Sequence, residues 1–466
     1  AGRPIVAWVG PGNNGGDALL AALRLRACGF SARAIALDAR RTPGGDAGEI
    51  WRRARERGFP IEPAEAWEPI FAAPLAPIVI DGLFGIGLQR PLDERIAAMC
   101  ARIAERRWPV VAVDVPSGID ADTGARLGST AVRARVTVTM IADKPGLRTA
   151  AAVDHAGEVR IADLGIGAGQ RSAALGRVPP KDRGRLFDRP AAQATALPQR
   201  ACDTSKGSFG SVLCYGGAPG LRGAVLLAAR GAQAIGVGRI YVGTPAGELF
   251  DPAQPQWMSV AADADTQRFD AIAIGCGLGD SDAARAALRR AIDGARALLL
   301  DADALNVIAA DDGLALSLAA RNEARRTVAT PHPLEAARLL RTDVPRVQSD
   351  RIGAACALAA KLNCVALLKG AGTVVASPAG SWSIVDAGSP ALASAGTGDV
   401  LAGACAALLA RGLDAEDAAC LGAWLHGKAG EAWAHVHGTA DGLSAAELHE
   451  WIRSAAAGLR SAEGFR

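Results

Sequence analysis

Short runs of Val, Ile and Ala alternate with amphipathic helical stretches along the first part of this chain. A strand that is followed by a helix and then by another strand closes into a parallel sheet with helices on its faces. The alternation therefore predicts a Rossmann-like, doubly wound α/β domain. Helical patterns lie at Asp17–Cys28 and Gly45–Arg57. The expected strands are Ile5–Val9, Arg33–Leu37, Pro77–Ile80, Val110–Val113 and Val136–Met140.

A second α/β alternation with long Ala-rich helices fills the rest of the chain. Residues 169–196 separate the two halves; they are rich in Pro and Arg and lack sustained apolar periodicity, which predicts a linker. We therefore expect domains at residues 1–168 and 197–466. The expected strands of the second domain are Ser211–Tyr215, Arg239–Val242, Ala271–Ile274, Ala297–Leu300, Thr327–Ala329 and Val365–Leu368.

Composition excludes several classes of protein. Half of the 466 residues are apolar and the net charge is +3, with no block of basic residues, so we expect no nucleic-acid partner. The longest uncharged apolar stretch, Val400–Ala410, is far shorter than the ~20 residues of a membrane span. The nine cysteines are scattered and never spaced CxxC, which indicates reduced core residues of a cytoplasmic protein.

The stretch IVAWVGPGNNGGD, residues 5–17, contains a GxGxxG pattern after an apolar run. Asp38 lies at the end of the next expected strand, where dinucleotide-binding proteins place the acid that binds the ribose. A phosphate cradle needs bare backbone amides, however, and this turn carries two carboxamides and one carboxylate. The pattern by itself is weak evidence for a bound dinucleotide.

Polar side chains also follow other expected strands of the first domain, in segments that begin at Asp81, Asp114 and Asp143. The carboxyl ends of parallel strands open on one crevice, so Asn14, Asp81, Asp114 and Ser117 can converge there. Such oxygen donors suit a hard cation, and their low charge suits a monovalent one. The alternative is that they are turn residues that satisfy the loop backbone.

The segments GPGNNGGD, IDGLFGIGLQRPL, VAVDVPSGIDADTG, DKPGL and AGEVRIADLGI, in this order, resemble the NAD(P)H-hydrate epimerase family over residues 4–167. The resemblance implies that Asp114 contacts the substrate and that potassium is held by Asn14, Asp81 and Ser117. It also implies a hydrate pocket lined by Asn13, Asn14, Gly15, Gly16, Asp17, Gly85, Ile86, Gly87, Leu88, Gln89, Arg90 and Pro91.

Two departures from the family pattern stand out. Ala18 follows NNGGD where the family usually has Gly, and the usual helical segment ahead of the first strand is missing from this sequence. We expect the first change to be small, and the second to leave the pocket or a subunit contact incomplete.

The strongest chemical signal is SAGTGDVLAG, residues 394–403, which leads into an apolar helical run. A Gly-rich turn that opens a helix presents free amides and the positive end of the helix dipole to an anion, here at Gly396, Thr397 and Gly398. Asp399 beside it can accept the proton of a hydroxyl that is being phosphorylated. This layout is typical of a ribokinase-type kinase, although chance glycine-rich turns are common.

Further polar segments follow strands of the second domain, among them Lys369-Gly-Ala-Gly-Thr373, Lys206-Gly-Ser-Phe-Gly210, Gly275-Cys-Gly-Leu-Gly279, Asp301-Ala-Asp-Ala-Leu-Asn306 and Thr330-Pro-His-Pro-Leu-Glu335. Together they resemble the ADP/ATP-dependent NAD(P)H-hydrate dehydratases over about residues 197–453. The resemblance implies a ribokinase-like fold in which Ala224, Gly279, His332 and Asp399 contact the hydrate. It implies a nucleotide site formed by Lys369, Gly370, Ala371, Gly372, Thr373 and Gly398.

The second domain also departs from its family at two places. His332 is followed by Pro-Leu-Glu335, and Ser389 replaces the usual Asn before the GTGD segment. Neither change affects the residues proposed for chemistry.

Some side chains have a structural explanation beside the functional one. His435 and His437 form an HxH pattern without nearby Cys or acidic residues, so a metal role there is a weak hypothesis. His426 fits a packed helix histidine better than a catalyst. Asp301 and Asp303 can cap the following helix, or orient Mg²⁺ and its water shell.

The two resemblances together imply a bifunctional enzyme that repairs NADH-hydrate and NADPH-hydrate, with the first domain interconverting the R and S epimers and the second dehydrating the S epimer. The expected cofactors are K⁺ and Mg²⁺, with ADP (or ATP) as phosphoryl donor, and we expect a homo-oligomer. The alternative is a ribokinase-type small-molecule kinase with a non-catalytic binding domain at its N-terminus.

Overall fold

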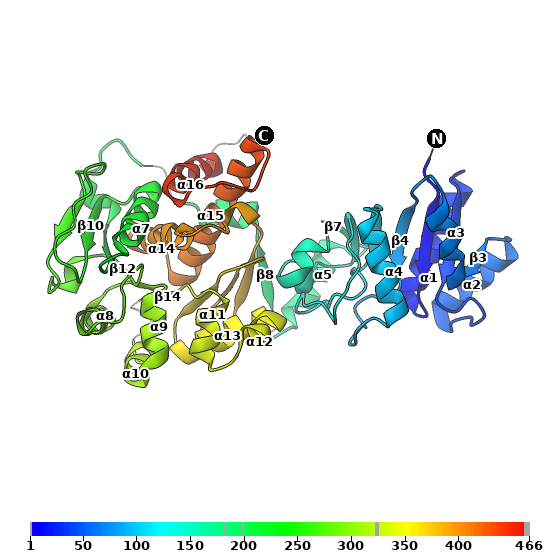
Figure 1. Ribbon diagram of the computed structural model, residues 1–466, viewed down its shortest axis with the longest axis horizontal. Coiled ribbons are helices and arrows are strands. Elements are labelled where there is room, and N and C mark those ends of the chain that lie inside the picture. Colours follow the sequence, from blue (N-terminus) through cyan, green and yellow to red (C-terminus); the bar gives the residue numbers. More distant parts are fainter. Residues whose placement is uncertain (1, 180–182, 198–199, 322–325, 461–466) are drawn as a thin grey trace. The chain divides into compact units, whose positions relative to one another are not determined.

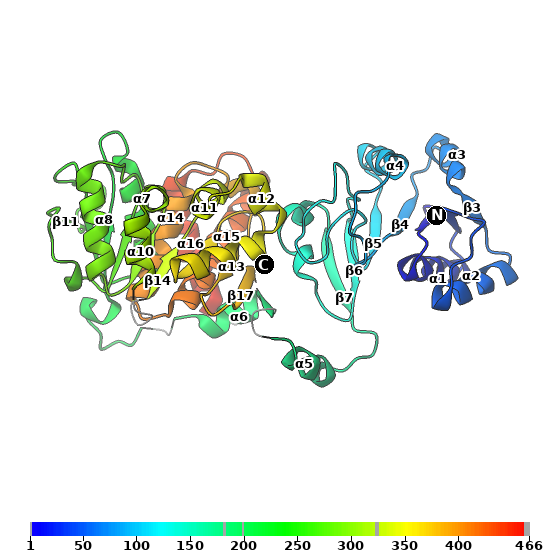
Figure 2. The same cartoon turned by 90° about the horizontal axis from the view of Figure 1, so that it is seen from below.

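A computed structural model describes residues 2–179, 183–197, 200–321 and 326–460 of the chain. The chain forms two compact units, which divide between Arg177 and Val178. Each unit contains a twisted sheet with helices packed on both of its faces (Figures 1 and 2).

The first unit contains a seven-stranded sheet in the order β3-β2-β1-β4-β5-β6-β7, and all neighbouring strands are parallel. The order reverses between β1 and β4, which opens a crevice at the carboxyl ends of these strands. The predicted doubly wound fold is confirmed. The strands are β1 (Ile5–Val9), β2 (Ala32–Ala36), β3 (Ile61–Pro63), β4 (Ile78–Gly82), β5 (Val110–Val113), β6 (Val136–Met140) and β7 (Glu158–Ala162), and the helices are α1 (Asn13–Ala27), α2 (Gly45–Glu56), α3 (Trp67–Ala72), α4 (Glu94–Glu105) and α5 (Ala168–Gly176).

Alternate side chains of β1 enter two different cores. Ile5, Ala7 and Val9 pack against α1 and α2, whereas Val6 and Trp8 pack against α3 and α4. This alternation follows from the period of two in a strand, and burial on both faces explains why β1 is an uninterrupted apolar run. Helix α1 begins at Asn13, four residues before the predicted start, so the NNGGD segment forms its first turns.

The second unit contains a ten-stranded sheet in the order β11-β10-β9-β12-β13-β14-β15-β16-β17-β8. Its strand pairs are parallel except for β15-β16 and β16-β17. The order reverses between β9 and β12, which creates a second crevice. The strands are β8 (Gly184–Phe187), β9 (Ser211–Tyr215), β10 (Arg239–Gly243), β11 (Met258–Val260), β12 (Ala271–Ile274), β13 (Leu298–Leu300), β14 (Thr327–Ala329), β15 (Val365–Leu368), β16 (Val374–Ala376) and β17 (Trp382–Val385).

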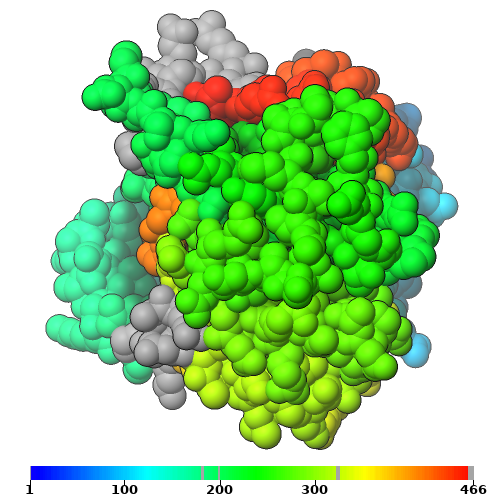
Figure 3. All heavy atoms as spheres, turned by 90° about the vertical axis from the view of Figure 1, so that its left-hand side faces the viewer, coloured from blue at the N-terminus to red at the C-terminus, as the bar shows by residue number. Residues whose placement is uncertain are grey.

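Helices cover both faces of this second sheet. One core contains Val212 and Cys214 of β9 with α7 (Arg222–Ile235), α14 (Thr397–Ala410), α15 (Ala415–His437) and α16 (Ala445–Arg460). The opposite core contains Leu213 and Tyr215. Its helices are α8 (Asp282–Gly294), α9 (Asp303–Ala310), α10 (Asp312–Ala319), α11 (Pro333–Leu340) and α13 (Arg351–Leu362), beside the short α12 (Val344–Ser349). Viewed from the side of β10 and β11, the unit shows mainly residues from its first half, coloured green (Figure 3).

The boundary between the units differs in detail from the expected linker at residues 169–196. Helix α5 belongs to the first unit, whereas β8 pairs in parallel with β17 and is followed by α6 (Arg189–Thr195). Residues 184–195 therefore lie in the second unit, ahead of the expected start at residue 197. Residues 180–182 of that linker lie outside the described residues.

The cysteines are free thiols, and those at 100, 214, 276, 364, 405 and 420 are buried. None of the helices in the described ranges combines the length and the apolar character that a membrane crossing requires.

Helices α7 and α14 approach each other closely because glycines face the partner backbone. A Cβ on Gly231 would lie 2.0 Å from the carbonyl oxygen of Val400, and one on Gly403 would lie 1.7 Å from that of Ala228. Any side chain at these two positions would force the helices apart. The close contact fixes where the first turn of α14 sits against the rest of the unit.

We expect Gly403→Ala to destabilise the second unit by about 3 kcal/mol, at the upper end of the cost of overpacking, because its new methyl group would meet backbone that cannot rotate away. Gly223→Ala on the facing helix is the matched control, since no heavy atom lies within 4 Å of the added Cβ. That substitution should leave the stability unchanged or raise it by up to about 1 kcal/mol. Urea unfolding of both variants checks this, and equal midpoints would contradict it.

Candidate functional site

A fully buried carboxylate, Asp81, lies at the end of β4 in the crevice of the first unit. Its Oδ1 accepts hydrogen bonds from Ser117 Oγ at 2.7 Å and Leu83 N at 3.2 Å, and its Oδ2 accepts from Ser117 N at 2.8 Å. Burial raises the pKa of Asp81 to about 6, although these donors act in the opposite direction. Asp81 and Ser117, predicted as partners from their strand ends, are thus in direct contact.

The third oxygen donor predicted for a cation, Asn14, lies on α1 beside the same strand end. A Cβ on Gly85 would lie 3.3 Å from Asn14 Cγ and 3.2 Å from Asp114 Oδ2, so Asn14 and Asp114 flank this glycine. The Nδ2 atom of Asn14 is buried and has no hydrogen-bond partner among the described residues.

Asp114 follows β5 with a left-handed backbone, φ 67°. Its Oδ1 lies 2.8 Å from Lys144 Nζ and accepts longer bonds from Thr139 Oγ1 and Met140 N, both at 3.3 Å. Burial, together with the neighbouring Asp114 charge, raises the pKa of Asp17. Two carboxylates in different environments therefore share this part of the crevice.

The remaining residues predicted for the hydrate pocket divide into two kinds. Gly15 and Gly16 are buried packing positions, since a Cβ on Gly15 would lie 2.1 Å from the carbonyl oxygen of Gly10 and one on Gly16 3.0 Å from Ala47. Asn13 is exposed at the start of α1. The loop after β4 is mostly exposed: Ile86, Gly87, Gln89, Arg90 and Pro91 are accessible, and Leu88 is buried.

In the second unit, Asp301 is the buried centre of the crevice at the end of β13. Its Oδ1 lies 2.6 Å from Lys369 Nζ and accepts a 2.7 Å hydrogen bond from Thr330 Oγ1. Burial alone would lower the pKa of Lys369, but the charges of Asp301 and Glu335 outweigh burial and raise it. Lys369 is therefore held as a cation at the carboxyl end of the sheet.

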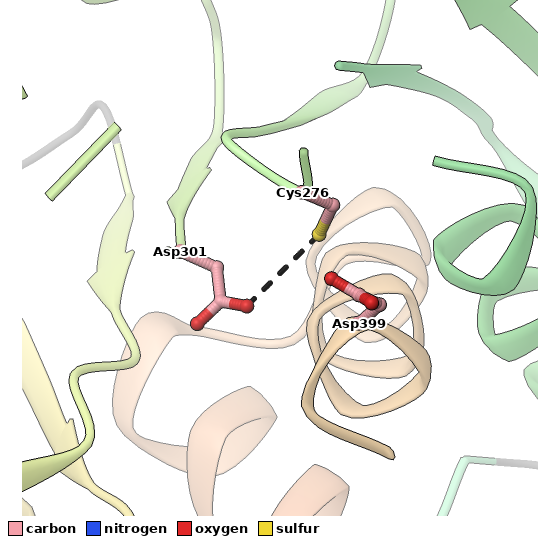
Figure 4. Close-up of side chains that lie close together, drawn as sticks. All are labelled: Cys276, Asp301 and Asp399. Atoms are coloured by element: carbon pink, nitrogen blue, oxygen red, sulfur yellow. Dashed lines mark hydrogen bonds between the residues drawn. The ribbon is translucent and has the colours of Figure 1, made fainter. Parts of the chain in front are cut away.

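Asp399 faces Asp301 across a short gap that contains the thiol of Cys276 (Figure 4). Cys276 Sγ lies 4.0 Å from Asp301 Oδ2, and one ligand atom from each of the three residues lies within 4.8 Å of the others. Burial and the Asp301 charge raise the pKa of Asp399 to about 6, although Cys276 and Lys369 oppose the rise. A carboxylate with this pKa accepts a proton readily near neutral pH.

The backbone around Asp399 has the predicted form. Gly396 caps α14 with φ 88°, the helix begins at Thr397, and Asp399 lies in its first turn. A Cβ on Gly398 would lie 3.5 Å from Lys369 Nζ, so the amide end of the helix and this cation face the same space. An anion there would meet the helix dipole and the lysine together.

The turn Lys369-Gly-Ala-Gly-Thr373 follows β15, and the buried Arg351 holds it. Arg351 Nη2 donates to the carbonyls of Leu368 and Lys369 at 3.1 and 3.2 Å. Gly370, with φ 140°, lies against the same guanidinium, whose Nη1 would be 2.9 Å from an added Cβ. Gly370 and Ala371 are exposed and Gly372 and Thr373 partly exposed, so the turn is accessible to a ligand.

The loops after β9 and β12 meet at the switch point of the second sheet. Gly217 N and Ala218 N donate to the carbonyls of Cys276 and Gly277 at 3.0 and 2.7 Å. A Cβ on Gly277 would lie 3.1 Å from that of Ala224, which places the predicted contact Ala224 beside the loop that carries Gly279.

The capping alternative for Asp301 and Asp303 does not hold. Helix α9 has Ala302 as its N-cap and no side-chain capping bond, because Asp301 pairs with Lys369 and Asp303 Oδ2 accepts from Gly279 N at 2.9 Å. Both carboxylates thus face the crevice loops.

His332 caps α11. Its Nδ1 accepts from Leu334 N and Glu335 N, and its Nε2 lies 3.1 Å from Glu335 Oε1, which fixes the tautomer with a proton on Nε2. Burial raises the pKa of Glu335 to about 7 and lowers that of His332. The ring is almost half exposed, and the charges of Lys369 and Asp301 act on its pKa, so it lies near the crevice.

His426 and His437 have structural partners. His426 Nε2 lies 2.9 Å from the carbonyl oxygen of Thr397, and burial lowers the pKa of His426 to about 4, so this neutral side chain anchors the start of α14. His437 Nδ1 lies 2.8 Å from the carbonyl oxygen of Trp433 and its ring stacks on that indole. The described residues bring no metal-binding cluster together at His435 and His437.

Three residues of these crevices had no predicted role. Lys144 lies in the DKPG segment and Cys276 in the GCGLG segment. Both segments were predicted to lie at the crevices, but no role was predicted for these two residues. Arg351 lies in no motif, and only its burial beside the Lys369 turn reveals it.

Two family models match the chain. The model described as NAD(P)H-hydrate dehydratase matches residues 212–453, and the one described as YjeF-related protein N-terminus matches residues 1–146.

Similar proteins cover both units together. A bifunctional NAD(P)H-hydrate repair enzyme of Gloeobacter violaceus is 37% identical over 94% of this chain and 86% of its own length. One from Escherichia coli is 34% identical over 95% of this chain and 83% of its own length. The crystal structure of the ADP/ATP-dependent NAD(P)H-hydrate dehydratase of Bacillus subtilis, co-crystallised with ATP and Mg²⁺, aligns with 58% of this chain and 97% of its own, at a TM-score of 0.51 and 31% identity.

Proposed function

The chain belongs to the family of bifunctional NAD(P)H-hydrate repair enzymes, and from that premise we propose how its residues divide the work. The enzyme interconverts the R and S epimers of hydrated NADH and NADPH and restores the S epimer to the reduced dinucleotide. We assign the first activity to the first unit and the second to the second unit. The observation that carries the assignment is Asp399, which lies at the amide end of α14 beside the Asp301–Lys369 pair.

Epimerisation requires proton transfer at the hydrated ring, and two carboxylates of the first unit suit it. Asp114 forms an ion pair with Lys144, whereas burial and the Asp114 charge raise the pKa of Asp17. Carboxylates in different environments can act as base and acid. Residues 13–17 and 85–91 would enclose the substrate between α1 and the loop after β4.

Dehydration at the second site begins with transfer of a phosphoryl group to the ring hydroxyl. Asp399 accepts the hydroxyl proton while Lys369 and the amides of Gly398 and its neighbours hold the phosphates. The phosphate then leaves with the bonding electrons, the adjacent carbon loses a proton, and the ring double bond re-forms. Ala224, Gly279 and His332 would contact the hydrate.

The phosphoryl donor is a nucleotide bound at the turn from Lys369 to Thr373. We propose ADP as the preferred donor, with AMP and phosphate as products, by analogy with the ADP/ATP-dependent Bacillus subtilis enzyme. Mg²⁺ bound to the phosphates would neutralise their charge. Asp301 and Asp303 are the carboxylates that would hold this ion, directly or through water.

Potassium fits the oxygen donors of the first crevice. Asp81 and Ser117 are buried and in contact, and Asn14 lies beside the same strand end. One carboxylate with a hydroxyl and an amide suits a monovalent cation better than a divalent one. We further propose that the enzyme is a homo-oligomer in the cytoplasm.

Asp399→Asn should keep nucleotide affinity and lose dehydration by about 10²–10⁴-fold, because the variant cannot accept the hydroxyl proton. In the wild type, kcat/KM should fall as the pH drops below about 6, where Asp399 becomes protonated. The absorbance of reduced nicotinamide, in reactions started with S-hydrate, Mg²⁺ and ADP, measures the dehydration rate of the variant and the pH dependence of the wild type. Near-normal turnover of the variant would remove Asp399 from the mechanism, and a stable phosphorylated product would indicate a kinase instead.

Replacing K⁺ by Li⁺ should slow epimerisation and lower the unfolding temperature of the first unit, because an ion bound only to the native state stabilises it. Ser117→Ala should weaken both responses, and Asp81→Ala should abolish them. Thr149→Ser, a conservative change at another buried hydroxyl, serves as control. If the wild type epimerises and melts identically in K⁺ and Li⁺, there is no potassium site.

The two sites should fail independently, since each has its own strands and acids. The Asp114→Ala variant should dehydrate pure S-hydrate at the wild-type rate. On a mixture of epimers its reaction should stop once the S epimer is consumed, apart from slow spontaneous conversion of R to S. Asp399→Asn should show the reverse pattern. Chromatography of the epimers over time separates these results. Loss of S-hydrate dehydration in a folded Asp114→Ala variant would show that the sites are not independent.

A further inference from the structure

A cavity of the first unit opens at the carboxyl ends of β1 and β2. It has a volume of about 180 Å³. Its walls include Gly10 and Pro11 after β1, Asp38 and Arg41 after β2, and Trp51 of α2. The epimerisation chemistry proposed for Asp17 and Asp114 makes no use of this cavity.

Two polar groups of this cavity have unused binding capacity. Asp38 Oδ1 accepts from Arg40 N at 3.0 Å and Arg41 N at 3.3 Å, but its Oδ2 has no partner among the described residues. The guanidinium of Arg41 makes no ion pair within the described ranges. The side chain of Trp51 is 1% exposed and forms part of the wall. The cavity thus offers an acceptor and a cation.

The cavity and the proposed epimerase crevice lie along the same carboxyl edge of the first sheet. In the strand order β2-β1-β4-β5, Asp38 follows β2 and Asp114 follows β5, so three strand spacings, about 14 Å, separate the two ends. The first turn of α1 lies between them. A dinucleotide laid across this edge would place one nucleoside at each end and its pyrophosphate near the amides of that turn.

We propose that this cavity binds the adenosine half of the hydrated dinucleotide, with Asp38 accepting a hydrogen bond from the ribose 2′-hydroxyl and Arg41 pairing with the 2′-phosphate of the NADPH form. This assignment rests on the proposed epimerase function and adds to it the residues that discriminate between the two substrates. The carboxylate favours the hydroxyl of NADH-hydrate, whereas the guanidinium compensates the phosphate of NADPH-hydrate. Pro11, Leu37 and Pro43 supply apolar wall for the base.

The test measures epimerisation of each R-hydrate without nucleotide or Mg²⁺, so that the second site stays idle. Asp38→Ala should raise KM for NADH-hydrate about tenfold, the loss expected for one charged hydrogen bond, and leave kcat unchanged. Arg41→Ala should raise KM about tenfold for NADPH-hydrate only. Asp46→Ala, which removes an exposed carboxylate from the first turn of α2, is the matched control and should change neither constant.

A truncated substrate separates binding of adenosine from a general effect on the fold. The hydrate of reduced nicotinamide mononucleotide lacks adenosine, so the wild type and both variants should epimerise it equally. Unchanged constants for both dinucleotides, or equal losses on the truncated substrate, would overturn the assignment. If the wild type epimerises none of the three substrates, the proposed function fails and this assignment fails with it.

Discussion

Parallel pairing on both sides of β1 and of β9 is the constraint on which both crevices depend. The chain leaves β1 toward β2 on one side and later returns to β4 on the other side, and it does the same at β9 with β10 and β12. The loops that follow the neighbouring strands therefore diverge and leave a crevice at the carboxyl edge of the sheet. Asp81, Asp114, Asp301 and Lys369 all stand at or just after strands that border this edge. The two sheets therefore determine where these four side chains lie, and the packed helices keep the strands in position.

Within each crevice one buried carboxylate organises its surroundings. Asp81 accepts two hydrogen bonds from Ser117 and one from Leu83, and Asp301 fixes Lys369 and Thr330. Removing a charge from water is costly, so such groups persist only where donors or cations compensate them. Burial and a neighbouring like charge raise the pKa values of two further carboxyls: Asp17, which faces Asp114, and Asp399, which faces Asp301.

Much of this architecture could be predicted from the sequence, and the exceptions have physical reasons. Most central strands are continuous apolar runs because both of their faces are buried, and those that were predicted match the structure almost to the residue; the buried strands β16 and β17 were not predicted. Edge strands such as β3 and β8 were missed, since half-exposed residues such as Ile61–Pro63 carry no such pattern. Motif segments located the crevice acids, but Arg351 could not be found, because its role arises only when α13 packs under the Lys369 turn. The Asp301 and Asp303 pair resembles a helix cap in sequence, and only the fold shows that Lys369 and Gly279 occupy these carboxylates instead.

The thiol of Cys276 lies between two carboxylates at the centre of the dehydratase crevice. Burial and the charges of Asp399 and Asp301 raise the pKa of Cys276 well above its ordinary value. Peroxides and disulfides react with the thiolate, so a sulfur atom that stays protonated is largely inert toward them. Cys276 can therefore lie beside Asp399, the proposed base, with little tendency to be oxidised there.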